Sequence, residues 1–202
     1  MAIQFSRREA LLLTATLTIV GPEYCSAESI VGKVSDLTGN ATASIEDKTR
    51  PLSVKAPVLL GDLVGTGVES RLGLALGSNT SLRLGAETKL RIESYIVDAG
   101  GELDFNQGTM LFDREPRQTP GNYRVNTPYG LIAVRGTRFV AGSSNGKFAV
   151  FVSRGKVEVS GGGASVLLTS GMGTDFATQG AQPSVPVEWK QKRVDALFAQ
   201  VL

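Results

Sequence analysis

The segment TPYGLIAVRGTRFVAG, residues 127–142, decides the fold class of this chain. Two short apolar runs, Leu131–Val134 and Phe139–Ala141, flank a turn that reads RGTR. A phosphate-binding loop would need several glycines or a helix N-terminus behind the turn, and strand-like residues follow here instead. Gly136 is therefore interpreted as a bend or bulge between two strands, with Arg135 and Arg138 at its rim.

The same pattern of short strand-like segments and turns extends from Ile30 to about Ala177, where alternating apolar segments are separated by Gly, Asn, Asp, Ser and Pro. The breaks recur about every 8–12 residues, which is typical of a sandwich or barrel. No stretch sustains a helical period, and the 24 glycines of the chain suit many tight turns. An all-β domain is predicted, with three hairpins: Arg71–Leu76 with Ser81–Leu84, Gly101–Phe105 with Thr109–Phe112, and Lys147–Val152 with Lys156–Val159.

The N-terminus has the charge–apolar–small order of a secretory signal. Arg7 and Arg8 precede the apolar run Ala10–Val20, which at 11 residues is shorter than the roughly 20 that span a bilayer. Small residues before Glu28 predict cleavage after Ala27, so residues 1–27 are assigned as a cleavable signal peptide. The adjacent arginines fit either the general secretory or the twin-arginine route, and the mature chain is expected in the periplasm without a transmembrane span. A retained anchor or buried N-terminal helix is the alternative.

Cys25 is the only cysteine. The residues before it, Pro22 to Tyr24, differ from the small and apolar set of lipoprotein signals. Cleavage after Ala27 would remove this thiol and leave a mature chain without disulfides, which a domain of this size tolerates. Redox chemistry is excluded on this interpretation.

Charge and histidine content narrow the function classes. The 21 basic and 19 acidic residues are dispersed, so no nucleic-acid partner is expected. The chain has no histidine, which removes Ser-His-Asp and Cys-His systems and His-ligated metals. We predict no catalytic, cofactor-binding or metal-binding residues and no enzyme. Glu102 and Asp104 stay open as a glycosidase-like carboxylate pair, although alternation with Leu103 and Phe105 indicates an ordinary solvated strand face.

The tail after residue 180 differs from the rest. A proline-containing linker that ends at Pro186 leads into an expected C-terminal amphipathic helix, with Pro186 suited to its first turn. Val194, Leu197, Phe198 and Val201 form one apolar stripe. The helix either packs on its own β-domain or docks a partner, because its stripe must be covered. The predicted units are residues 28–180 for the β-domain and 181–202 for linker and helix.

Several motifs in order give the chain a resemblance to the FecR domain family. They are TPYGLIAVRGTRFVAG, then FAVFVSRGKVEVS and VLLTSGMGTDF, with LGD and SLRL upstream. The resemblance covers roughly residues 32–176 and implies a jelly-roll-like β-sandwich that works outside the cytoplasm. In the best-known arrangement, such a protein passes a signal from an outer-membrane iron-siderophore transporter to a sigma factor. That arrangement needs a cytoplasmic N-terminal segment, a membrane span and a C-terminal module that contacts the transporter. The sequence predicts a cleavable signal, no span and only a short helix after the β-domain, so a free-standing periplasmic FecR domain is expected.

The leading hypothesis is therefore a non-enzymatic sensory or protein-interaction module, with iron-uptake signalling as its setting and an unidentified protein as partner. Candidate partner-contacting residues are Arg135, Arg138, Val194, Leu197 and Phe198. Two alternatives stay open: a cell-wall or carbohydrate-binding module, and a structural assembly protein whose edge strands pair between subunits. Aromatic residues are only 6% of the chain, which weakens the carbohydrate alternative. The sequence identifies no small ligand.

Overall fold

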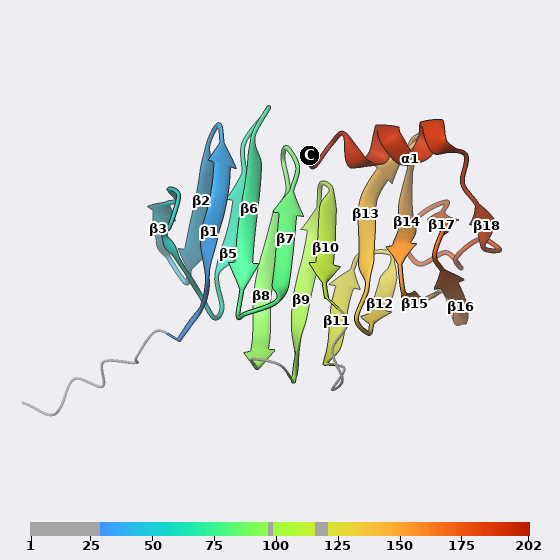
Figure 1. The fold of residues 1–202 in the computed structure, drawn as a ribbon, viewed down its shortest axis with the longest axis horizontal. Coiled ribbons are helices and arrows are strands. Elements are labelled where there is room, and N and C mark those ends of the chain that lie inside the picture. Colours follow the sequence, from blue (N-terminus) through green and yellow to red (C-terminus); the bar gives the residue numbers. More distant parts are fainter. Residues whose placement is uncertain (1–28, 97–98, 116–120) are drawn as a thin grey trace, which may run out of the picture.

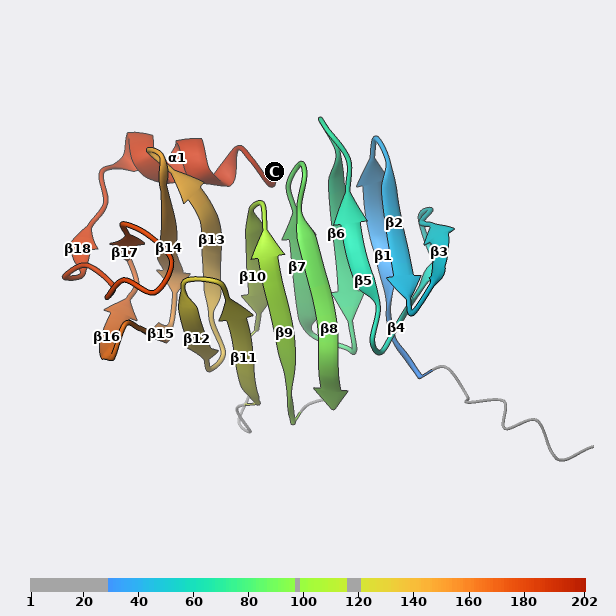
Figure 2. The same ribbon diagram turned by 180° about the vertical axis from the view of Figure 1, so that it is seen from behind.

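The protein is an open β-sandwich of two long stacked sheets (Figures 1 and 2). The computed structural model describes residues 29–96, 99–115 and 121–202. The expected signal peptide, residues 1–27 with Cys25, lies outside the described residues. Within the described part, no helix has the length and apolar character needed to cross a membrane. The expected all-β sandwich with one C-terminal helix is confirmed.

Each sheet contains nine strands of the described chain. Sheet A runs in the spatial order β18 (Val187–Glu188), β17 (Met172–Phe176), β14 (Lys147–Arg154), β13 (Arg138–Ser144), β10 (Met110–Arg114), β7 (Thr80–Leu84), β6 (Arg71–Leu76), β1 (Ile30–Thr38) and β4 (Pro57–Leu59). Sheet B runs in the order β16 (Ala164–Thr169), β15 (Lys156–Gly161), β12 (Gly130–Val134), β11 (Asn122–Thr127), β9 (Gly100–Gln107), β8 (Lys89–Ile96), β5 (Leu63–Thr66), β2 (Ala41–Ile45) and β3 (Lys48–Pro51).

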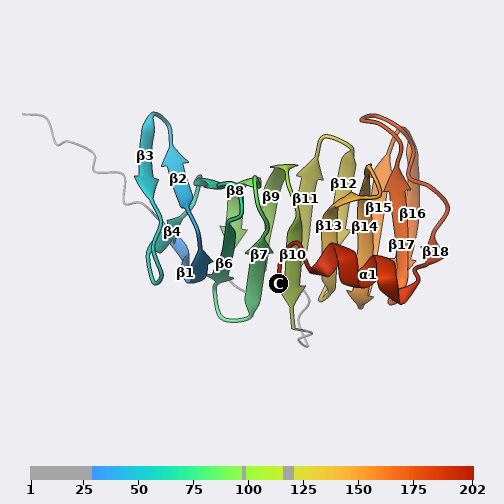
Figure 3. The ribbon, with the colours of Figure 1, turned by 90° about the horizontal axis from the view of Figure 1, so that it is seen from above.

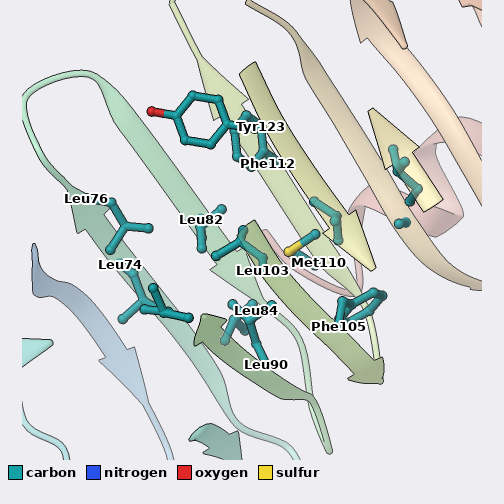
Figure 4. Close-up of a cluster of buried hydrophobic side chains, with 14 of the residues drawn as sticks. Leu74, Leu76, Leu82, Leu84, Leu90, Leu103, Phe105, Met110, Phe112 and Tyr123 are labelled. Carbon is teal, nitrogen blue, oxygen red and sulfur yellow. The ribbon is translucent and has the colours of Figure 1, made fainter. Parts of the chain in front are cut away.

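The core lies between the sheets and follows from period-two alternation, since successive strand residues point to opposite faces. Leu82 and Leu84 of β7 are fully buried, whereas Arg83 between them is exposed. From the opposite sheet, Leu103 and Phe105 of β9 point into the same layer (Figure 4). One continuous apolar cluster therefore joins the two sheets along the molecule.

Several of the points where the chain changes sheets are glycine corners. Gly108 joins β9 to β10, Gly136 joins β12 to β13, and Gly155 joins β14 to β15, each with positive φ. A Cβ at Gly108 would lie 2.2 Å from Oγ1 of Thr88, so a larger residue does not fit there. Gly136 is thus a bend, as expected, but the strands on either side of it do not pair with each other.

Of the three predicted hairpins, the first is confirmed and the other two are wrong. β6 and β7 pair antiparallel in sheet A. β9 and β10 lie in different sheets, as do β14 and β15. The physical reason is that a turn glycine between two alternating segments serves a hairpin and a crossover equally well. Because β10 is a single strand inserted in sheet A, β9 and β11 run in the same direction and form a parallel pair in sheet B.

Helix α1 spans Gln191–Phe198, so it begins later than Pro186 suggested. Val187 and Glu188 pair with β17 as strand β18, which keeps this part of the tail extended. Lys190 is the N-cap residue. Viewed from above, the helix runs across the strands on the outer side of sheet A (Figure 3).

Candidate protein-interaction surface

Helix α1 is held on sheet A by a second, smaller apolar cluster. Its buried members are Leu111, Val140, Phe151, Leu197 and Val201. Leu197 and Val201 are each only 1% exposed. The partly buried Trp189, Val194 and Phe198 pack around them. The stripe predicted from the sequence is thus covered by the chain's own sheet, which was the first of the two alternatives.

The strand sequences explain why the helix packs at this position. Outward-facing positions of a one-sided sheet are polar, but β10, β13 and β14 contain the unbroken apolar runs MLF, FVA and AVFV. A strand that is apolar on both faces is buried on both faces. This signal could have located the helix site from the sequence, and the sequence reasoning did not use it.

Polar contacts add direction to the packing of the tail. Arg193 donates to the Asp175 carboxylate on β17 and, at 3.0 Å, to Oγ of Ser144. Gln200, just after the helix, contacts Oγ1 of Thr109 at 2.6 Å. These bonds extend from β17 to the corner between β9 and β10, so they fix the helix along the sheet as well as against it.

Trp189 sits at the start of the tail with its ring engaged by the protein. It stacks on Phe151 with ring centroids 5.2 Å apart, and the guanidinium carbon of Arg193 lies 3.5 Å from the Trp189 ring centroid. A sugar platform needs an aromatic face that is available to the ligand. The single tryptophan instead serves the docking of the tail.

Beside the helix, the outer face of sheet A carries a group of charged residues. Asp113 of β10 lies 2.8 Å from Nη2 of Arg154 and 3.5 Å from Nε of Arg138, two arginines that face each other across β13 and β14. The guanidinium carbon of Arg138 also lies 5.7 Å from the ring centroid of Phe198 on the helix. We call Asp113, Arg138, Arg154 and Phe198 the charged–aromatic patch.

The patch combines properties that are common in protein interfaces. Two guanidinium groups share one carboxylate, so donors remain for an acidic partner. Arginine and aromatic side chains are enriched at protein–protein contacts relative to other surface residues. The side chains of Asp113, Arg138 and Arg154 are partly exposed, as a contact surface requires.

The structure therefore unites some of the predicted contact residues and separates one. Arg138 and Phe198 meet in the patch, and Val194 and Leu197 support the helix from below. Arg135 is exposed in the corner between β12 and β13, and no described hydrogen bond or ion pair joins it to the patch. Asp113 and Arg154 were missed because their roles arise from strand register, which local patterns do not reveal.

The carboxylate pair considered for glycosidase chemistry lies elsewhere, on the outer face of sheet B. The side-chain amide of Asn126 on β11 donates to both Glu102 and Asp104 at 2.8 Å. Burial, with a hydrogen bond to Asp104, raises the pKa of Glu93 beside them. Asn126 on the neighbouring strand β11 thus provides hydrogen bonds to both carboxylates, and the pair forms part of a solvated sheet face. Among the described residues, no cluster of three or more His, Cys, Asp or Glu could hold a metal ion.

A buried arginine was also missed. Arg114 points to the inner face of sheet A, like Met110 and Phe112 at the alternate positions of β10, and it is 1% exposed. It donates to Oγ1 of Thr80 at 2.8 Å and to the Tyr123 hydroxyl at 2.6 Å. A buried charge that is hydrogen-bonded in this way joins the two sheets, because its partners come from β7 and β11.

Comparison with known proteins agrees with this architecture. The sequence model of the family described as FecR protein matches residues 62–158. This match identifies residues 62–158 as a FecR domain, which makes up just under half of the chain. The sandwich continues beyond the matched segment on both sides, with β1 to β4 before it and β16 to β18 after it. No curated protein matches the chain.

Two solved structures share the fold. Both are crystal structures of a candidate anti-sigma factor from Parabacteroides distasonis ATCC 8503, at 1.65 Å and 2.50 Å resolution. Each is 18% identical to this chain with a TM-score of 0.56 and covers 66% of it. The chain spans 63% and 62% of the length of those proteins.

Proposed function

We propose that this protein is a non-enzymatic signalling regulator that binds another protein through the charged–aromatic patch. The FecR domain over residues 62–158 supports the class of function. The solved structures with this fold, described as candidate anti-sigma factors, support the same class. The observation that carries the proposal is the meeting of Arg138, Asp113 and Arg154 with Phe198 on a face braced by the tail helix.

The chemistry of the patch indicates the kind of partner. The three side chains of the ion-pair group carry two positive charges and one negative charge, so the group is net cationic. An acidic segment of a partner would replace water around the guanidinium groups and add charge-assisted hydrogen bonds. The Phe198 ring adds an apolar contact next to these charges.

The N-terminal sequence and the family resemblance support a proposed setting for this function. A cleavable signal over residues 1–27 would place the sandwich in the periplasm. We propose that the regulator acts there in siderophore-dependent iron-uptake signalling. The domain would sense or relay the state of an envelope protein and so alter transcription.

Gene deletion in the source bacterium, followed by transcript profiling with and without iron, tests this proposal. Loss of the protein should change a defined set of transcripts, and the change should depend on iron. Wild-type protein should restore the pattern, and Arg138→Glu should not, because it reverses the charge that faces the partner. Lys48→Glu is the matched control, since it reverses an exposed lysine on the distant strand β3.

The outcome is decisive only when both variants fold. Thermal melting monitored by circular dichroism should show that each variant keeps the sandwich. Lys48→Glu changes an exposed charge and should alter stability by about 0.5 kcal/mol or less. Arg138→Glu should cost more, about 1 kcal/mol, because it places a second carboxylate beside Asp113. Unchanged transcripts in the deletion strain would contradict a regulatory role. Full complementation by Arg138→Glu would contradict the role of the patch and leave the class of function standing.

A further inference from the structure

The four sheet edges of the sandwich differ in how well they are protected. Exposed strand edges pair with other chains unless they are short, charged or interrupted by proline. β18 has two residues and β4 has three, beginning with proline. β3 has the sequence KTRP, with two cations and a terminal proline. β16 has six residues, ASVLLT, and carries neither charge nor proline.

The register of β16 shows which backbone groups are free. Gly162 and Gly163 form the two-residue turn from β15, both with positive φ, and Gly161 faces Ala164 across it. In a hairpin with a two-residue turn, the pair that flanks the turn is hydrogen-bonded, here Gly161 and Ala164, and the following pairs alternate between non-hydrogen-bonded and hydrogen-bonded. Ser165, Leu167 and Thr169 therefore direct their N–H and C=O groups away from β15. Among the described residues, β16 forms no backbone hydrogen bonds beyond the ladder with β15.

Strands β16 and β18 lie at the same end of the sandwich (Figure 1), and three exposed apolar side chains lie in or next to them. Leu167 of β16 is 57% exposed. Val185 and Val187, just before and within β18, are 79% and 51% exposed. An unprotected edge with apolar side chains around it is a typical site of strand addition.

We propose that β16 is a self-association edge, at which β16 of a second copy of this chain pairs antiparallel. A two-fold axis at Leu167 places this residue opposite its own copy. Ser165 then faces Thr169, and Val166 faces Leu168, in both directions across the axis. The two B sheets would become one continuous sheet, as isologous contacts between identical subunits allow. The inference is independent of the proposed signalling function.

The side chains are compatible with this pairing on both faces. On the inner face, Val166 and Leu168 alternate across the junction, which extends the apolar layer from one copy to the next. On the outer face, Glu158 neighbours Leu167 within one copy. Two leucine strands separate the two Glu158 residues, at about 14 Å for three strand spacings, which exceeds the screening length in physiological salt. No like charges lie opposite each other.

The size of the contact sets the expected strength. A six-residue strand pair is smaller than a standard stable interface, so the dimer should depend on protein concentration. The purified protein should be measured by sedimentation velocity or light scattering from roughly 1 µM to 1 mM, a range that brackets weak dimers. We expect the mass to rise from that of one chain to that of two.

Two variants at one position identify the edge. Leu167→Lys places two ammonium groups opposite each other in the proposed register, and Leu167→Pro removes the outward N–H without breaking a bond to β15. Both should stay monomeric across the range. Thr49→Lys, at an exposed position of the opposite edge strand β3, should dimerise like the wild type.

Circular dichroism melting confirms that each variant keeps the sandwich. A wild-type protein that is monomeric up to 1 mM would overturn the proposal, since the range reaches far above typical weak affinities of about 0.1 mM. A dimer that survives both Leu167 variants would overturn the assignment to β16. Loss of the dimer in Thr49→Lys would also contradict it.

Discussion

Truncation of Leu197 to alanine should detach the tail from the sandwich. Leu197 is 1% exposed and sits at the centre of the cluster under α1. Leu→Ala at such sites costs about 3 kcal/mol through lost transfer energy and the cavity left behind. The helix has eight residues, and isolated helices of that length are not stable in water. The loss should therefore appear as release of the tail, while the sandwich stays folded.

The single tryptophan makes this separable by spectroscopy. Trp189 lies against Arg193 of the helix, so its fluorescence reports on the tail. Far-ultraviolet circular dichroism reports on the strands. A cost of about 3 kcal/mol raises the undocked population about 100-fold. In urea, the fluorescence transition of Leu197→Ala should precede the dichroism transition, and amide exchange at Val201 should accelerate by the same factor.

Lys192→Ala is the matched control, because Lys192 is exposed on the same helix. It should leave both transitions within about 0.5 kcal/mol of the wild type. Superimposed transitions in Leu197→Ala, at the wild-type urea concentration, would refute the reasoning. That result would mean that the apolar cluster does not hold the tail.

Three further predictions test other parts of the molecule. Gly130→Ala should destabilise by several kcal/mol in thermal melts, because its Cβ would lie 1.9 Å from a backbone oxygen of β15; a wild-type melting temperature would contradict this. Asp113→Asn should cost about 1 kcal/mol in urea, since it leaves Arg138 and Arg154 facing each other, and high salt should reduce that cost. Burial raises the pKa of the Tyr95 hydroxyl from 10.0 to about 12 in the folded protein. The contribution of Tyr95 to the free energy of unfolding is therefore complete below pH 10 and is lost as the pH rises towards 12. Tyr95→Phe should remove this part of the loss of stability at alkaline pH, as measured by urea unfolding at each pH.

Much of the fold was accessible from the sequence because alternation is a local property. The segment around Glu102 to Phe105 shows this, with apolar residues inside and carboxylates outside. The apolar stripe of the tail predicted a covered helix for the same reason. A residue's own neighbours decide such features, so no long-range information is needed.

The crossovers were not accessible in the same way. Gly108 and Gly155 resemble hairpin turns, yet each leads the chain into the opposite sheet. The choice depends on distant pairing: β10 fits between β7 and β13, with Met110 opposite both Leu84 and Ala141. Which strands β10 pairs with is decided by packing between segments far apart in the sequence, and a local pattern does not contain this information.

The candidate surface was predicted only in part for a related reason. Arg138 and Phe198 were selected separately and are 60 residues apart in the chain. Their meeting depends on where the helix packs, and the charges around them depend on the register of β10, β13 and β14. The apolar runs of those strands were the sequence signal that could have connected the two.

The alternation of the chain between sheets has a consequence for how such proteins vary in length. From β5 and β6 onward, both sheets gain their strands in chain order. Each added segment rests on strands already in place, so the cross-section stays constant while the molecule grows along one axis. Strands can thus be added or removed at the ends of the sandwich without a change in the pairing of the central strands.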